Sequence, residues 1–105
     1  MKRLRLLNPF RIRKVVRQIR EASGGGGPKS VRLVEISHPE GWILPTARVS
    51  LDVVARDGTV TRFEPNFPIP FPYAWAYRIA RRLHVPIVSE VNPERLRAEV
   101  PIPGR

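Results

Sequence analysis

Residues 48–64 read RVSLDVVARDGTVTRFE, which is two runs of alternating apolar and polar residues on either side of a turn. Alternation with a period of two indicates strands that each bury one face. An Asp-Gly dipeptide between such runs, here Asp57-Gly58, is typical of a β-hairpin. The stretch therefore predicts an antiparallel pair of strands at the centre of the fold.

The length of the turn sets which residues face each other across this hairpin. A two-residue loop would place Val53 opposite Arg62 and would mix apolar with charged residues on both faces. A three-residue loop with Gly58 in the left-handed conformation places Asp52 opposite Arg62 instead. This second arrangement gives one apolar face and one face of paired charges, so we predict it.

A proline-rich segment at residues 65–72 separates the hairpin from a predicted helix at residues 72–84. A proline at the first helical position is favoured, and apolar residues then recur every three or four positions. Pro86 ends the helix and leads into a predicted strand at residues 85–91. The apolar stripe comprises Ala76, Ile79, Ala80 and Leu83, and the arginines away from it are Arg78, Arg81 and Arg82.

Residues 1–22 predict a short basic lead, Met1–Leu7, followed by a basic amphipathic helix. Asn8 suits the cap and Pro9 the first turn of a helix that runs to about Ala22. Such a helix binds membranes, acidic proteins or nucleic acid. Alternatively, its apolar stripe packs on the sheet of this same chain and its arginines are merely solvated. The stripe comprises Ile12, Val15, Val16 and Ile19.

Residues 23–29 contain four consecutive glycines and predict a flexible linker. They do not form a phosphate-binding loop of the P-loop type, because no strand precedes them and no Gly-Lys-Ser/Thr follows. Residues 30–105 are then predicted as the folded domain, beginning with a strand at Ser30–Ser37. A helical turn at residues 92–98 and an extended tail complete the prediction.

The predicted fold class is α+β. A small antiparallel sheet of three or four strands packs against one amphipathic helix, with a separate basic N-terminal helix. The predicted order of elements is α-β-β-β-α-β.

Charge is distributed very unevenly along the 105 residues. The net charge is +10, of which residues 1–29 carry +8 and the remaining chain +2. This asymmetry indicates an anionic partner. Of 19 basic residues, 16 are arginines, which suit bidentate recognition of phosphate. A GC-rich genome explains the arginines equally well, and twelve prolines without cysteine also suit a thermophile.

The sequence contains no pattern that indicates catalysis. The absence of cysteine excludes disulfides, thiol catalysis and cysteine-ligated zinc. Neither His38 nor His84 has a second ligand at a metal-binding spacing on a helix, and a local pair of His38 with Glu40 is a poor metal scaffold. We therefore predict no enzymatic activity, metal or cofactor. A catalytic site assembled only in three dimensions is the alternative.

Aromatic residues are concentrated in one segment. Five of the eight lie between Phe67 and Tyr77, directly before three arginines. Aromatic rings beside arginines suit stacking on unpaired bases, and they also suit a membrane interface. The third interpretation is that this segment closes one end of the hydrophobic core.

Together these patterns predict a small basic binding or assembly protein. Its N-terminal helix would contact nucleic acid or a nucleoprotein assembly. The alternative is a peripheral membrane-surface protein that uses this helix and the aromatic segment; other protein subunits are further candidate partners. The candidate contact residues are Lys2, Arg3, Arg5, Arg11, Arg13, Lys14, Arg17, Arg20, Arg78, Arg81 and Arg82.

No secretory signal and no stretch long enough to cross a bilayer is apparent in the sequence. We therefore expect the protein in the cytoplasm or within a particle. The alternative is that the arginine-rich start is a mitochondrial transit peptide.

Overall fold

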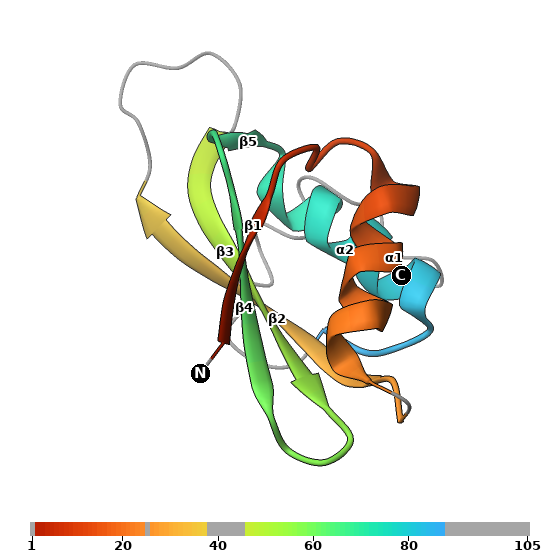
Figure 1. The fold of residues 1–105 in the computed structure, drawn as a ribbon. Helices are drawn as coiled ribbons and strands as arrows, with labels where there is room; N and C mark the ends of the chain where they lie inside the picture. The colour runs from red at the N-terminus through yellow and green to blue at the C-terminus, as the bar shows by residue number, and fades with distance from the viewer. Residues whose placement is uncertain (1, 25, 38–45, 88–105) are drawn as a thin grey trace.

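The computed structural model describes residues 2–24, 26–37 and 46–87 (Figure 1). The elements are β1 (Lys2–Leu6), α1 (Ile12–Ser23), β2 (Pro28–Ser37), β3 (Thr46–Ala55), β4 (Val60–Pro65), β5 (Ile69–Pro70) and α2 (Pro72–Leu83). The expectations at residues 38–45 and 88–105 lie outside the described residues. They include the His38–Glu40 pair, the helical turn and the tail.

Among the described residues, five strands form one mixed sheet. Four of them follow the order β1-β4-β3-β2, and β5 pairs with the start of β3. β1 is parallel to β4, whereas β3 is antiparallel to β2, β4 and β5. β1, β2 and β4 therefore run in one direction. Ile87 adds a parallel bridge to Val31 on β2.

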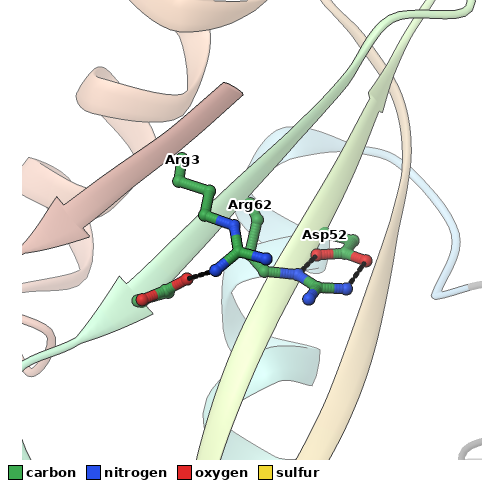
Figure 2. A network of polar contacts seen from close by, with 4 residues as sticks. Arg3, Asp52 and Arg62 are labelled. Atoms are coloured by element: carbon green, nitrogen blue, oxygen red, sulfur yellow. Dashed lines mark hydrogen bonds and ion pairs between the residues drawn. The ribbon is translucent and has the colours of Figure 1, made fainter. Parts of the chain in front are cut away.

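The hairpin of β3 and β4 has the predicted register. Asp52 lies opposite Arg62, and Gly58 has a φ of +91°. The two-residue loop is thereby ruled out. Arg62 donates from Nε and Nη2 to the two carboxylate oxygens of Asp52, at 2.7 and 2.9 Å (Figure 2). The hydrogen bond to this carboxylate raises the pKa of Arg62.

Both helices pack against the same face of the sheet (Figure 1). Leu51 and Phe63 face each other across the hairpin and are fully buried. Ile79 of α2 is also fully buried. α1 contributes Val15, Val16 and Ile19 to the same hydrophobic core. One core is therefore built from the sheet and both helices.

α2 forms as predicted. It spans Pro72–Leu83, and its apolar stripe of Ala76, Ile79, Ala80 and Leu83 is buried. His84 adopts the left-handed conformation after the helix. Its amide donates to the Arg81 carbonyl, and that of Val85 to the Ala80 carbonyl at 3.1 Å. This pattern satisfies the last carbonyls and ends the helix before Pro86.

The predicted sheet and the predicted separate helix are wrong, although the α+β class holds. The lead at residues 1–7 forms β1, so the order begins with a strand and the sheet is mixed and larger than predicted. The cause is a short alternation in which Leu4 and Leu6 point to the core and Arg3 and Arg5 point away from it. Only 1% of Leu6 is exposed. α1 is not separate, because burying its apolar stripe in the core removes that surface from water.

α1 also begins later than its capping signal predicts. The Asn8 carbonyl accepts a hydrogen bond from the Arg11 amide at 3.1 Å, which forms a turn, and the helix starts at Ile12. Pro9 is buried, and its carbonyl accepts a hydrogen bond from Trp75 Nε1 at 2.7 Å. This tertiary contact outweighs the local preference for a helix start at Asn8-Pro9.

Gly24, Gly26 and Gly27 lie between two packed elements, α1 and β2. Ser23 belongs to α1, where its hydroxyl donates to the Ile19 carbonyl at 2.7 Å, and Pro28 already belongs to β2. Gly27 has a φ of +73°, and its carbonyl accepts a hydrogen bond from the Arg56 amide at 3.3 Å. The turn between α1 and β2 is therefore held against the tip of the hairpin.

Candidate anion-binding groove

α1 and α2 lie side by side and run in the same direction. Trp75, near the start of α2, bonds to Pro9 just before α1. At the other end, Arg20 Nη2 donates to the Arg82 carbonyl at 3.3 Å. The topology explains this arrangement, because β1 leads into α1, β4 leads through β5 into α2, and β1 and β4 are parallel. Both helices therefore start from the same end of the sheet (Figure 1).

An open groove of about 1030 Å³ runs between the two helices. Among the described residues that line it, Ile12 and Val16 are apolar and Glu21 is acidic. The described lining also contains six arginines and the histidine that follows α2, so its net formal charge is +5 with the histidine neutral. These residues are Arg13, Arg17, Arg20, Arg78, Arg81, Arg82 and His84.

The buried stripes of the two helices direct the arginines into this groove. On α1, the arginines recur at positions i, i+4 and i+7, which is one side of a helix. Val15 and Ile19 face the sheet, so this side is left at the surface. On α2, burial of Ile79, Ala80 and Leu83 leaves its three arginines exposed in the same way.

Glu21, the described acidic side chain in the groove, forms no salt bridge with the described arginines there. Within the part of the chain that the structure describes, no salt bridge involves any of the six arginines. Arg20 donates to a backbone carbonyl, which leaves its positive charge in place. All six side chains belong to exposed residues and are accessible to an anion.

Helix dipoles account for only half of these arginines. Arg20, Arg81 and Arg82 lie in the last turns, where cations interact favourably with the carbonyl ends. Arg13 lies in the first turn of α1, which contains no acidic residue and where a cation is unfavourable. Arg13–Arg17 and Arg78–Arg82 are also like-charge pairs at i, i+4, each of which destabilises a helix by about 0.2–0.5 kcal/mol. Helix stability therefore does not explain the pattern.

The eleven cations predicted from the sequence separate into two sets. The six arginines named above line the groove, and five residues lie elsewhere. Arg3 pairs with Glu64 at 3.6 Å, and Arg5 Nη1 donates to Asn66 Oδ1 at 3.2 Å. Lys2 lies on β1, Arg11 precedes α1, and Lys14 lies in a small hollow beside Arg5.

Sequence reasoning missed how the two groups of arginines meet. It assigned the first group to a detached helix. The groove exists because β1 pairs with β4, which brings the starts of α1 and α2 together. The alternation of Arg3 and Arg5 with Leu4 and Leu6 was the one available signal for that pairing.

The predicted aromatic segment divides into buried and exposed residues. Tyr73 and Trp75 are buried in the core, which agrees with the closing role considered for this segment. Phe67 and Phe71 are each 40% exposed. The ring of Phe67 contacts that of Phe10, with 5.3 Å between the ring centroids.

Neither a metal centre nor a membrane span is found in the described part of the chain. Among those residues, no three histidine, aspartate or glutamate side chains gather closely enough to hold a metal ion. The two described helices have 12 residues each, and neither is long and apolar enough to span a bilayer. Comparison with protein-family models, curated proteins and solved structures finds no match.

Proposed function

We propose that this protein is a non-enzymatic binding module that holds the phosphate backbone of nucleic acid in the groove between α1 and α2. The observation that supports this most directly is the convergence of six arginines from two helices, none of which forms a salt bridge with another described residue. Clustered cations on one surface are typical of nucleic-acid recognition. The nucleic acid is free or part of a nucleoprotein assembly.

The dimensions and chemistry of the groove suit a polyanion better than a single small anion. A helix of 12 residues is about 18 Å long, which spans several phosphates; along one strand of a duplex, at about 3.4 Å per phosphate, the number is about five. The guanidinium group is planar and presents paired donors that match phosphate oxygens. The site of action would be the cytoplasm or the interior of a particle, with nucleic acid or other subunits as partners.

The test compares two triple variants that lose the same charge. One removes groove cations (Arg13→Gln, Arg17→Gln, Arg78→Gln), and the other removes cations outside the groove (Lys2→Gln, Arg11→Gln, Lys14→Gln). Affinity for a labelled oligonucleotide is measured by anisotropy over a range of salt concentrations. Because each lost phosphate contact lowers the log–log slope by about 0.7–0.9, the groove variant should lower it by about 2–3. The control variant should keep the wild-type slope.

Equal slopes in the two triple variants would show that net charge alone drives binding and would reject the groove. Circular dichroism confirms that both variants are folded. Glutamine is a helix former nearly as good as arginine, so the substitutions inside α1 and α2 preserve helix propensity.

Peripheral membrane binding is the second candidate function. It is favoured by the exposed apolar side chains of Leu7, Phe10, Phe67 and Phe71, which lie beside basic residues. Purely electrostatic attraction to anionic vesicles falls with salt, as binding to nucleic acid does. Co-sedimentation with anionic vesicles that persists at high salt would favour the membrane and reject nucleic acid.

A further inference from the structure

Three phenylalanines are exposed at the surface of the described structure. Phe10 is 53% exposed, and Phe67 and Phe71 are 40% exposed. The rings of Phe10 and Phe67 lie in contact at a tilt of 35°, which is a stable arrangement for two aromatic side chains. These three residues, called the aromatic platform below, offer ring surface to solvent.

Two members of the aromatic platform, Phe10 and Phe71, lie just before the starts of the two helices whose arginines line the groove. Phe10 follows Pro9 and precedes the groove residue Ile12 by two positions. Phe71 directly precedes α2, and its carbonyl accepts the Trp75 amide hydrogen at 3.0 Å. Since the indole of Trp75 binds Pro9, one buried contact holds both phenylalanines near the helix starts.

The backbone at Phe71 is strained. Its φ of 51° and ψ of 61° are left-handed, and no side-chain hydrogen bond caps the helix there. A bulky residue in this conformation costs about 1–3 kcal/mol, and such strain is concentrated at functional sites. The strained residue here is also one of the exposed aromatic ones.

We infer that the ligand of the groove is single-stranded nucleic acid, with unpaired bases stacked on the aromatic platform while their phosphates follow the arginines. This inference rests on the proposed function and specifies its ligand. Bases in a duplex are already stacked on each other, whereas an unpaired base has free faces that an aromatic ring can cover. The arginines supply the complementary charge next to the rings, as in single-strand binding sites.

The experiment removes the aromatic faces and keeps the apolar volume. Phe10→Leu with Phe67→Leu is compared with Phe10→Tyr with Phe67→Tyr, which retains both rings. The ligands are a labelled single strand, the duplex of equal length, and an abasic strand that has phosphates but no bases. Because both residues are exposed, the fold should persist, and the thermal unfolding midpoints check this.

The leucine variant should bind the single strand about 5- to 150-fold more weakly, which corresponds to losing one stacked base. Its affinity for the abasic strand and its salt slope should stay at the wild-type values. The tyrosine variant should keep the wild-type affinity. Wild-type protein should prefer the single strand to both the duplex and the abasic strand.

Several results would overturn the inference, and they differ from those that reject the groove. Equal binding of the abasic and normal strands, a preference for duplex, or full affinity in the leucine variant would reject base stacking. If the groove triple variant still loses its salt slope, the proposed function stands without the aromatic platform. If the leucine variant binds anionic vesicles as tightly as the wild-type protein does, these residues would be assigned to membrane binding instead.

Discussion

The arginines on the outer face of the sheet and those in the groove have opposite surroundings. Arg62 makes a two-pronged ion pair with Asp52, and Arg3 in the same cross-strand row pairs with Glu64 (Figure 2). In the groove, by contrast, no described acid forms a salt bridge with the arginines. The same residue type thus stabilises the fold in one region and remains available to a ligand in the other.

The secondary structure explains how each pattern arises. Antiparallel strands place residues from distant parts of the chain directly opposite each other, so a correct register brings Asp52 to Arg62. A helix instead brings together residues three or four positions apart. Where those residues are all arginines, as in α1 and α2, the helix concentrates charge of one sign.

Removing the Arg62 guanidinium should have the largest effect on stability. Arg62→Gln removes the two hydrogen bonds that the guanidinium donates to the carboxylate of Asp52, whose side chain is only 11% exposed. Hydrogen bonds to charged groups contribute about 1.5–3 kcal/mol, and the value should lie at the lower end because the Arg62 side chain is 25% exposed. Urea unfolding measures the loss.

Arg3→Gln is the matched control, because Arg3 is also paired across strands but is far more exposed. Its separation from Glu64 is 3.6 Å, with side-chain exposures of 64% and 34%. We expect a loss below about 1 kcal/mol. Equal losses for the two variants would contradict the distinction between a partly buried and an exposed pair.

The pairing of Asp52 with Arg62 depends on the turn at Gly58. Gly58→Val should reduce the free energy of unfolding by about 1 kcal/mol or more, since a β-branched residue resists a φ of +91°. An added Cβ meets no atom within 4 Å, so the effect would come from the backbone and not from a clash. Gly58→Asn, which tolerates the left-handed region, should lose less; the opposite ranking would contradict this explanation.

Substitution in the groove should have the opposite sign. Arg13→Gln removes a cation from the positive end of α1 and from repulsion with Arg17, so stability should rise by a few tenths of a kcal/mol. Lys14→Gln should have a similar effect on stability, because Lys14 is also in the first turns of α1. Only Arg13→Gln should lower the salt slope of nucleic-acid binding, by about 0.7–0.9. A destabilised Arg13→Gln variant would assign a structural role to this arginine.

The smallest expected effect concerns Asp57 in the exposed turn. The hydroxyl and the amide of Thr59 donate to its carboxylate and lower its pKa below the ordinary value of 3.8. A lowered pKa in the folded state stabilises the protein above pH 3.8, and this contribution disappears as the pH falls through the lowered value. Urea unfolding as a function of pH should show a slight loss below pH 3.8 that Asp57→Asn lacks. A loss of the same size in both proteins would assign it to other carboxylates.

Local signals predicted the hairpin and α2 correctly, because Asp-Gly and the proline at the helix start act within a few residues. The start of α1 was mispredicted, because a hydrogen bond from Trp75, far along the chain, competes with the capping signal of Asn8. Each groove arginine was identified from the sequence, but their convergence was not. It depends on a parallel pairing of Leu4 with Phe63, for which short stretches of sequence carry little information.

Two of the described hydrogen bonds between the segments of α1 and α2 differ in burial and in donor–acceptor distance. At one end a buried indole N–H is held at 2.7 Å from the Pro9 carbonyl; at the other, an exposed guanidinium reaches the Arg82 carbonyl at 3.3 Å. The first hydrogen bond is shielded from water, and the second is exposed to it. If the groove widens, we therefore expect α1 and α2 to separate at the His84 end while their spacing at the Phe10 end stays constant. Arg20 forms the exposed hydrogen bond and also lines the groove. A phosphate bound there would therefore compete with the Arg82 carbonyl for the Arg20 guanidinium.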